Sequence, residues 1–495
     1  MMNFTSLLLL VGLPALAMAH ELDMSNRWAS GEVMDTIMAA KQRTWADYRA
    51  QGYFAEGKWK SSNKFSPCIS SGNATAGGKA TVAGIEYGCK NLDVTGYLSH
   101  QDLGSTFNNT VGSSIWGITI EGREFVAIGQ SDGAAFAEVV GKGWWNKHGK
   151  EAGTLDYIGR LPAGSLPSTW REIKSYKHYA VIGSEAVGHG IQIFDMRKLL
   201  ALRKDRLSRA TRTFSIATDV SVFTGLPVGR SHNVVIAEDS QHIIAVGAQP
   251  RNSTCLSGLI FIDVSDINNP KQSGCNDQDG YVHDAQCLIY HGPDKKYEGR
   301  EICYGYNENS LAIYDITDKA RSTLISNTTY PGASYTHQGW VLDTANQEYL
   351  LLDDEQDETE MAGAAADQKA TTYIWNIMSL ERPFQTGIYK STVTSIDHNQ
   401  YIAKGFTYQS NYAAGLRILD ISSIPRDPTG AGIEEVAYFD VFPEDDAVGV
   451  AEYMGTWANT GGWFKSGYVV VNTMDRGTFV VQRSKRVLGG YRAEF

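Results

Sequence analysis

The sequence predicts an all-β protein, a seven-bladed β-propeller that carries a short N-terminal helical and disulfide-tied extension. Three observations predict this fold: a strand-like segment that recurs seven times, a polar segment that precedes each copy, and an incomplete last unit. A sheet of so few short strands does not bury its two faces by itself. Stacked copies are therefore expected to close into a ring.

The recurring strand follows a glycine or another small residue and alternates apolar with polar side chains, which is the pattern of a half-buried strand. Its seven copies are GAAFAEV (133–139), GHGIQIFDM (188–196), GLIFIDVSD (258–266), SLAIYDITD (310–318), TYIWNIM (372–378), GLRILDISS (415–423) and GTFVVQ (477–482).

A second segment lies upstream of each copy, and a middle strand such as HIIAVGA (242–248) or YLLLDDE (349–355) separates the two. Successive upstream segments are roughly 50 to 60 residues apart, which suits four strands per unit. These segments are IWG (115–117), TWRE (169–172), SHNVV (231–235), VHDAQ (282–286), THQGW (336–340), DHNQY (397–401) and GTW (455–457).

The last unit ends after its third strand, near residue 482, whereas an extra strand-like segment, LDVTGYLSHQDLG (92–104), precedes the first unit. If this segment pairs with the last unit, the ring closes and no sheet edge stays exposed. The propeller is therefore expected to span residues 92–482, followed by a tail at 483–495.

Residues 20–91 are expected to form an extension outside the propeller. Ser30 is a candidate cap for a helix over about 31–51. The apolar side chains of this helix fall on one face at 3.6-residue spacing and are expected to pack on the body of the protein. They are Met34, Ile37, Met38, Trp45 and Tyr48. The Gly- and Ser-rich segment 52–90 is predicted to be a disulfide-tied loop.

Several features predict secretion. Residues 1–19 have the apolar core and small-residue cleavage site of a signal peptide, and no later segment has the length of a membrane span. Six cysteines suit an oxidising compartment, and their spacing favours the pairs Cys68–Cys89, Cys255–Cys275 and Cys287–Cys303. Glycosylation sequons occur at Asn73, Asn108, Asn252 and Asn327, all in predicted loops.

The net charge of −11 argues against nucleic acid as a partner, because no basic stripe is present to neutralise phosphates. The sequence also contains no nucleophile elbow, phosphate-binding loop or dinucleotide fingerprint. A serine hydrolase or a nucleotide-dependent enzyme is therefore disfavoured.

Four long segments resemble the choice-of-anchor B family of exported proteins with LVIVD-type repeats. They are WREIKSYKHYAVIGSEAVGHGIQIFDM, DGYVHDAQCLIYHGPDKKYEGREICYGYNE, YTHQGWVLD and AGLRILDIS. The resemblance covers about residues 90–482 and implies a secreted or surface-held β-propeller. It brings no catalytic residue set, and the sequence departs from the members of that family that end in a cell-surface anchor.

The upstream segments also predict a site, because the innermost strands of a propeller line its central channel and place equivalent residues on one rim. Those residues are Trp116, Arg171, His232, His283, His337, His398 and Trp457. Four consecutive histidines favour a metal site for Cu, Zn or Fe. Neighbouring side chains are candidates to orient the imidazole rings: Asp284, Asp397, Asn233, Asn399 and Gln338.

Two other interpretations of the histidines remain open. They can line a metal-free ligand or catalytic pocket, or they can hydrogen-bond the backbone of the next blade and hold the ring together without a ligand. Elsewhere, Arg171 with Glu172 and Glu185 with His189 are candidate pairs at the same mouth. Three acidic segments are candidates for surface calcium: 353–360, 443–446 and 276–280.

The resulting functional prediction is a secreted propeller with a metal or ligand site at the channel mouth. It would act as a metal-dependent oxidoreductase or hydrolase on an extracellular small molecule or polymer. The alternative is a non-enzymatic propeller that binds an extracellular protein or glycan.

Overall fold

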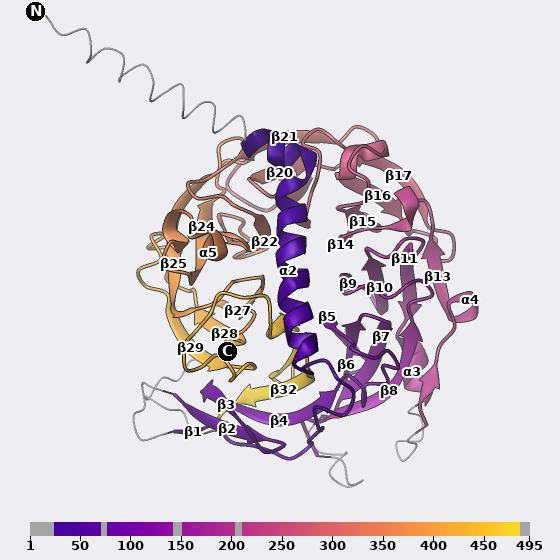
Figure 1. Ribbon diagram of the computed structural model, residues 1–495. Coiled ribbons are helices and arrows are strands. Elements are labelled where there is room, and N and C mark those ends of the chain that lie inside the picture. The colour runs from indigo at the N-terminus through magenta and orange to yellow at the C-terminus, as the bar shows by residue number, and fades with distance from the viewer. Residues whose placement is uncertain (1–23, 71–76, 142–150, 203–209, 486–495) are drawn as a thin grey trace, which may run out of the picture.

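The computed structural model describes residues 24–70, 77–141, 151–202 and 210–485, and its strands are arranged around a central channel (Figure 1). In these residues the strands form seven sheets. The predicted all-β propeller is confirmed. The predicted signal peptide and Asn73 lie outside the described residues.

The sheets are built mainly from consecutive antiparallel strands. One sheet comprises β5 (Gly112–Ile120), β6 (Arg123–Gln130), β7 (Gly133–Val139), β8 (Leu155–Pro162) and the short β12 (Arg212–Thr213). The short β12 is an exception, since it pairs parallel with β8. The next comprises β9 (Arg171–Tyr176), β10 (Tyr179–Ser184), β11 (Ile191–Asp195) and β13 (Val220–Phe223). The third comprises β14 (Asn233–Ala237), β15 (His242–Val246), β16 (Leu259–Asp263) and β17 (Lys271–Asn276).

The next three sheets continue around the ring. The fourth comprises β18 (Asp284–Ile289), β19 (Glu301–Tyr306), β20 (Leu311–Asp315) and β21 (Thr323–Thr328). The fifth comprises β22 (Thr336–Val341), β23 (Tyr349–Asp354), β24 (Lys369–Asn376) and β25 (Phe384–Thr394). The sixth comprises β26 (Asn399–Ala403), β27 (Phe406–Ser410), β28 (Leu416–Asp420) and β29 (Glu434–Phe439). In these six sheets the first strand faces the channel: β5, β9, β14, β18, β22 and β26.

The remaining sheet closes the ring. It joins β30 (Thr456–Asn459), β31 (Tyr468–Thr473) and β32 (Gly477–Arg483) to β4 (Leu92–Ser99), which pairs antiparallel with β32. The predicted completion of the last unit by an N-terminal strand is confirmed. Each channel-facing strand packs against the next one, and β30 packs against β5, so the described strands leave no gap in the circle.

The N-terminal extension differs from the prediction in two ways. Helix α2 (Glu32–Ala50) begins after Gly31, whose φ of 85° is left-handed, and no side chain caps it, so Ser30 is not the cap. Segment 52–90 is not only a loop. It forms β1 (Ile69–Ser70), β2 (Gly78–Val82) and β3 (Ile85–Lys90), and β3 extends the sheet of β26–β29 by pairing with β29.

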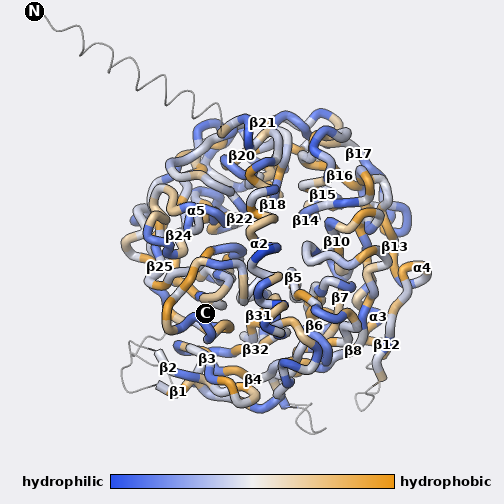
Figure 2. Tube along the Cα trace, in the orientation of Figure 1, coloured by the Kyte–Doolittle hydropathy of each residue, from blue (hydrophilic) through white to orange (hydrophobic). Residues whose placement is uncertain are grey.

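Apolar segments recur from sheet to sheet around the ring (Figure 2), and the packed faces between sheets form the core. Fully buried side chains there include Tyr304, Tyr373 and Trp375. Short helices lie in the connections: α3 (Arg197–Leu202), α4 (Ile216–Asp219), α5 (Asp357–Glu360) and 3₁₀ turns at Pro227–Gly229, Thr254–Ser257 and Gly363–Ala365.

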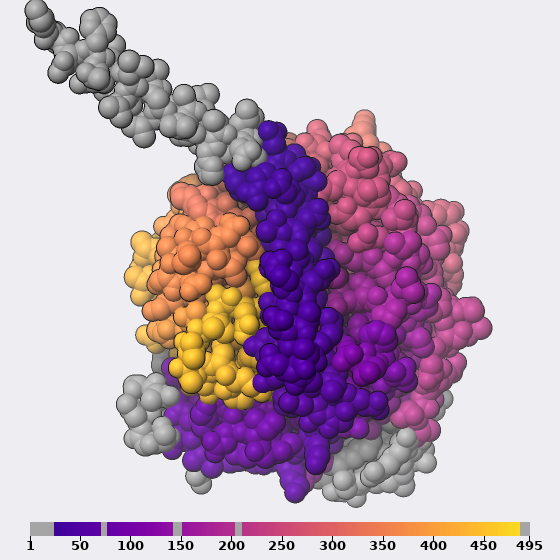
Figure 3. Space-filling model, in the orientation of Figure 1, coloured from indigo at the N-terminus to yellow at the C-terminus, as the bar shows by residue number. Residues whose placement is uncertain are grey.

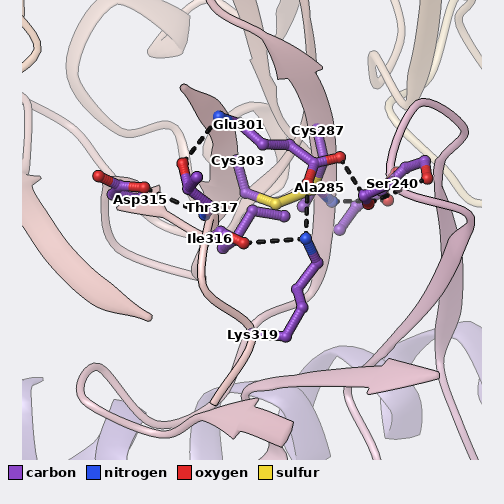
Figure 4. The surroundings of a disulfide bond; sticks show 11 residues. Ser240, Ala285, Cys287, Glu301, Cys303, Asp315, Ile316, Thr317 and Lys319 are labelled. Atoms are coloured by element: carbon purple, nitrogen blue, oxygen red, sulfur yellow. Dashed lines mark hydrogen bonds and ion pairs between the residues drawn. A yellow bond between two sulfur atoms is a disulfide. The ribbon is translucent and has the colours of Figure 1, made fainter. Parts of the chain in front are cut away.

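All three predicted disulfides form: Cys68–Cys89, Cys255–Cys275 and Cys287–Cys303. The last one joins directly opposed residues of β18 and β19. Beside it, Lys319 is buried with its Nζ 2.5 Å from Glu301 Oε2 and donates to the carbonyl of Ile316 (Figure 4). This sheet is therefore held together by a covalent bond and a buried ion pair.

Three of the predicted glycosylation asparagines lie in the described part of the chain, and all three are exposed. Asn108 and Asn252 lie in loops, as predicted. Asn327 instead lies in β21, the outermost strand of its sheet. Over the same residues, no helix combines the length and the apolar character that crossing a membrane requires.

Candidate functional site

Helix α2 lies across one face of the ring, over the central channel (Figures 1 and 3). Its buried side chains are Val33, Met34, Ile37, Lys41 and Trp45. Trp45 donates from Nε1 to the carbonyl of Tyr453 at 2.9 Å and packs against Trp170. The apolar face predicted for this helix therefore packs on the propeller, and it brings a lysine with it.

The four predicted histidines come together under α2. Their rings follow one another around the channel, with centroid distances of 4.3 Å for His232–His283, 4.2 Å for His283–His337 and 4.5 Å for His337–His398. They converge because each lies at or just before the start of a channel-facing strand, β14, β18, β22 or β26.

Hydrogen bonds set the orientation of three of these rings. His283 Nδ1 is 2.7 Å from the carbonyl oxygen of His337, and His398 Nδ1 is 2.7 Å from that of Trp457. A carbonyl oxygen only accepts, so Nδ1 carries the proton in both rings and the Nε2 lone pair is left for another ligand. His232 Nδ1 contacts Glu185 Oε1 at 2.5 Å.

A carboxylate that sequence reasoning missed lies among the rings. Glu355 Oε2 is 3.7 Å from His337 Nε2, and Glu355 Oε1 is 3.6 Å from His398 Nε2. The ligand atoms of His337, Glu355 and His398 all lie within 4.8 Å of one another, and all three residues are buried. Two donors each about 2.0–2.1 Å from one tetrahedral ion would be about 3.4 Å apart. The set can therefore hold a metal ion after small side-chain movements.

Lys41 of α2 contacts the same carboxylate. Its Nζ lies 2.6 Å from Glu355 Oε1 and 2.9 Å from Oε2, and the Tyr412 hydroxyl donates to Oε1. Burial opposes ionisation of Glu355, but the charge of Lys41 and the hydrogen bonds from Lys41 and Tyr412 outweigh burial and hold the pKa of this carboxyl below its usual value. Glu355 is therefore an anion at neutral pH.

The imidazoles of His283, His337 and His398 are neutral at neutral pH. Burial lowers the pKa of His398 to about 4, and Lys41 adds to this effect against the opposing influence of Glu355. Burial and the neighbouring histidines also hold the pKa of His283 and of His337 well below the usual range. Neutral imidazole is the form that binds metals, so the site presents neutral nitrogen donors and one carboxylate.

The residues predicted to orient the rings mostly bond backbone instead. Asn233 donates to the carbonyl of His283, Gln338 to that of Gln400, and Asn399 to that of Trp457. Asn399 Nδ2 also lies 2.9 Å from His398 Nδ1, so this amide does contact a ring, as predicted. These bonds join neighbouring channel-facing strands. The interpretation that this layer holds the ring together is thus correct for the amides and for Nδ1 of two histidines, while their Nε2 atoms remain free for a ligand.

The two predicted aspartates do not reach the imidazoles. Asp284 accepts from its neighbouring amide, that of Ala285, and lies near Lys174, deeper in the channel. Asp397 faces Asp357 and Glu358 instead of the histidines. The carboxylate beside His337 is Asp353, whose Oδ1 lies 3.6 Å from His337 Nδ1.

The residues that flank the histidines on the predicted rim do not all have the predicted surroundings. Trp457 packs beside His398, with ring centroids 5.1 Å apart, as predicted. Arg171 and Glu172 both border the same space, as predicted, but Arg171 donates to the carbonyl of Gln130 and contacts His189, so the two do not form an ion pair with each other. The other predicted pair is also wrong, because Glu185 bonds His232 and Arg230.

Trp116 lies at the opposite end of the channel. It packs on Trp463 and Tyr401, which also contact Trp340. Trp116 is four residues beyond the start of β5, and Trp340 and Tyr401 each follow their histidine by three residues. Three residues of strand span about 10 Å, so these rings form a separate aromatic layer.

The three acidic segments proposed for surface calcium differ in burial and in their partners. The side chains from Asp353 to Glu358 are buried, so this run is not a solvated loop. Asp279 of segment 276–280 accepts from the amides of Asn307 and Asn327. In segment 443–446, Asp446 forms an ion pair with Lys79 at 2.5 Å.

A sequence pattern could have found Lys41, but none could have found Glu355. Lys41 falls four residues from Ile37 and four from Trp45, within the apolar stripe of the helix. A lysine at that position must either reach solvent or find a buried anion. Glu355 ends the middle strand YLLLDDE, and no pattern distinguishes it from the other acidic residues of that run.

A groove of about 1050 Å³ runs beside α2 and is bordered by Trp28, Met34, Glu185, Arg230, Arg251 and Glu308. We call it the α2 groove. Glu185 connects the groove to the site, since it bonds His232, whose side chain is 10% exposed. A smaller cavity of about 20 Å³ lies in the channel between Lys41 and Glu172, enough for about one water-sized ligand.

No family model and no curated protein matches this chain. Many solved structures match this chain. One is the β-propeller domain of Cps50 (Swd1) from Myceliophteria thermophila, at 8% identity and a TM-score of 0.43, covering 76% of this chain and 99% of that one. Another is "a putative 6-phosphogluconolactonase" from Bacteroides uniformis, at 12% identity and a TM-score of 0.46, covering 75% and 94%.

Proposed function

We propose that this protein is an exported propeller that binds a transition metal under helix α2 through His337, Glu355 and His398. One observation carries the proposal: a buried carboxylate lies between two neutral imidazoles, with N–O distances of 3.6 and 3.7 Å. His283 is the next ring in the row and is available as a fourth donor.

The donor set determines the class of metal. Two imidazole nitrogens and one carboxylate suit Zn, Cu or Fe, whereas Ca and Mg prefer oxygen donors alone. A metal that keeps an open position there would activate water or bind an oxidisable group. The reaction class is therefore hydrolysis or oxidation of an extracellular substrate, which would approach through the α2 groove.

Secretion is part of the same proposal. The disulfides, the exposed sequon asparagines and the resemblance to the choice-of-anchor B family all support an extracellular protein. The family assignment and glycosylation at Asn73, Asn108, Asn252 and Asn327 are proposals that rest on the sequence.

The ion pair between Lys41 and Glu355 competes with metal binding. The ammonium of Lys41 contacts both oxygens of Glu355, and a metal cation bound to that carboxylate would repel it. The metal must therefore displace Lys41 from Glu355. Substitution of Lys41 by Met is expected to increase metal affinity.

The test is metal analysis of the purified full-length protein after saturation with Zn²⁺ or Cu²⁺ and dialysis. We expect one ion per chain in the wild type, and its loss in Glu355→Gln and His337→Asn. His100→Asn is the matched control, because His100 is also a buried histidine but bonds Thr473 in the closing sheet. Metal content that stays unchanged in the two site variants would overturn the proposal.

A second function is favoured by the position of α2, which lies across the face of the ring and whose Lys41 borders the same cavity as His232, His337 and His398. The α2 groove is open to solvent and bordered by charged and aromatic side chains, as in sites for polar ligands. In this alternative the protein binds an extracellular protein or glycan without catalysis. It predicts ligand binding that is weakened by Arg251→Ala and unaffected by Glu355→Gln.

A further inference from the structure

Behind the histidine layer, three carboxylates from two neighbouring sheets face one another. Asp357 and Glu358 lie in α5, which follows β23, whereas Asp397 precedes β26. Their ligand atoms lie within 4.8 Å of one another. The three residues are 0%, 0% and 1% exposed, so water does not separate their charges.

Four oxygen atoms of this cluster are buried without a hydrogen-bond partner. Both carboxylate oxygens of Asp397 are in this state, together with Asp357 Oδ1 and Glu358 Oε2. A contact between Asp397 and the backbone of Asp354 falls outside hydrogen-bond geometry. Such groups are costly to bury, so these four atoms point to a missing partner.

The other oxygens of the cluster are fixed in place. Asp357 Oδ2 accepts from the Tyr373 hydroxyl at 2.6 Å, and Glu358 Oε1 accepts from the amide of Thr371 at 2.9 Å. Each of these two side chains thus uses one oxygen for its orientation and leaves the other free. Bonds of this kind orient metal ligands in proteins.

Asp354 shows that the cluster is not merely a consequence of acidic sequence. It belongs to the same run, but its oxygens accept hydrogen bonds from Tyr330, Ser334, Tyr335, Gln356 and Asp357. Its carboxylate is satisfied by the protein alone. Among the ion pairs of the described residues, none includes Asp357, Glu358 or Asp397.

We propose that Asp357, Glu358 and Asp397 form a buried Ca²⁺ site that joins the sheets of β22–β25 and β26–β29. The donors are all oxygens, and Asp397 offers both of its oxygens, which suits the bidentate carboxylate coordination that Ca²⁺ accepts. Asp357 and Glu358 supply one oxygen each, and water or backbone carbonyls complete the coordination. No atom of His337, Glu355 or His398 takes part.

The first experiment uses the full-length protein freed of calcium with EGTA and then titrated with Ca²⁺ in a calorimeter. We expect one Ca²⁺ per chain, and affinity reduced by at least about 100-fold in Asp397→Asn. Asp440→Asn is the control, because Asp440 belongs to a separate acidic group with Asp445 and Asp446. Loss of binding in Asp440→Asn with full binding in Asp397→Asn would overturn the proposal.

Thermal unfolding supplies a second readout that does not depend on one variant. Calcium is expected to raise the unfolding temperature of the wild type but not that of Asp397→Asn. Without calcium the variant is expected to be at least as stable as the wild type, because it has one buried charge fewer. The alternative, a proton shared among the carboxyl groups, predicts no effect of calcium on the wild type.

If Asp397→Asn fails to fold, Glu358→Gln replaces it, since its amide oxygen still accepts from Thr371. Terbium provides a direct measurement on the wild type, because Tyr373 is bonded to Asp357 and would transfer excitation to a Tb³⁺ ion in the site. Tb³⁺ emission that Ca²⁺ displaces supports the proposal. Absence of both emission and calcium binding overturns it, and neither result bears on the histidine site.

Discussion

The two ends of the central channel use the same pair of charges in different surroundings. Under α2, Lys41 contacts Glu355 among four imidazoles. Toward the other end, Lys174 contacts Glu172 and lies 4.9 Å from the ring of Trp116 and 5.6 Å from that of Tyr401. Both lysine–glutamate pairs are buried.

The two ends differ in the kind of aromatic ring that surrounds the lysine–glutamate pair. Imidazole nitrogens have lone pairs in the ring plane. A metal ion bound to them can therefore take the place of the ammonium. Indole and phenol rings offer only their π faces, which attract an ammonium but hold no transition metal. The comparison indicates that a buried lysine–glutamate pair forms with or without imidazoles beside it, and that the histidines distinguish the end at which we propose the metal site.

The largest effect is expected from breaking either pair. Glu355→Gln and Glu172→Gln each leave a buried ammonium unpaired, which should lower the free energy of unfolding by about 3–5 kcal/mol. Urea denaturation measures this loss. The control is Glu381→Gln, which removes an exposed partner of Lys296 and should cost less than about 1 kcal/mol.

Metal content should distinguish Glu355→Gln from Glu172→Gln. Only Glu355→Gln should lose bound metal, because Glu172 has no imidazole in its ion pair or hydrogen bonds. Equal loss of metal from both variants would show that metal binding simply reports folding.

The second effect concerns acid stability. The pKa of His398 is about 4 in the folded protein, below about 6.5 in an unfolded chain. The unfolded state therefore binds the proton more tightly, so stability is complete above about pH 6.5 and is lost as the pH falls toward 4. This histidine accounts for about 2–4 kcal/mol of that loss.

His398→Asn tests this assignment, since its side-chain amide can still donate to the carbonyl of Trp457. Its unfolding free energy should fall less steeply between about pH 6.5 and 4. Tyr401→Phe at the aromatic end should keep the wild-type slope, because it removes no group that titrates there. Identical slopes in all three proteins would contradict the assignment.

The smallest effect is expected at the aromatic end. Trp463 is 37% exposed and packs on Trp116, Trp340 and Tyr401. Because its ring is partly solvated, Trp463→Ala should cost about 1–2 kcal/mol, less than truncation of a fully buried tryptophan. Thermal unfolding measures this cost, and metal content should stay at the wild-type value. A loss of metal would show that the two ends are coupled.

Much of the histidine site was predictable because it repeats. His232, His283, His337 and His398 occupy equivalent positions in four consecutive units, and ring geometry brings equivalent positions together. Trp116 was misplaced by the same reasoning, since its strand begins earlier relative to the motif. Asp397 was misplaced because it lies in the connection before β26, where no strand register fixes the direction of its side chain.

The repeat pattern could not predict Glu355 or Lys41 as residues of the site. Glu355 follows a middle strand, and Lys41 belongs to a helix outside the repeats. The partners of Asp357, Glu358 and Asp397 were equally hidden, because two of these residues are separated from the third by an entire strand pair.

The sequence by itself determined the propeller, its closure by residues 92–99, the three disulfides and the histidine row. Each follows from local alternation, repeat register or cysteine spacing, which are properties of nearby residues. Only the tertiary structure decided that α2 crosses the channel, that Lys41 meets Glu355 and that Asp397 turns toward α5. Lys41 and Glu355 are 314 positions apart, and two strands separate α5 from Asp397, so packing and charge, rather than local pattern, select the partner.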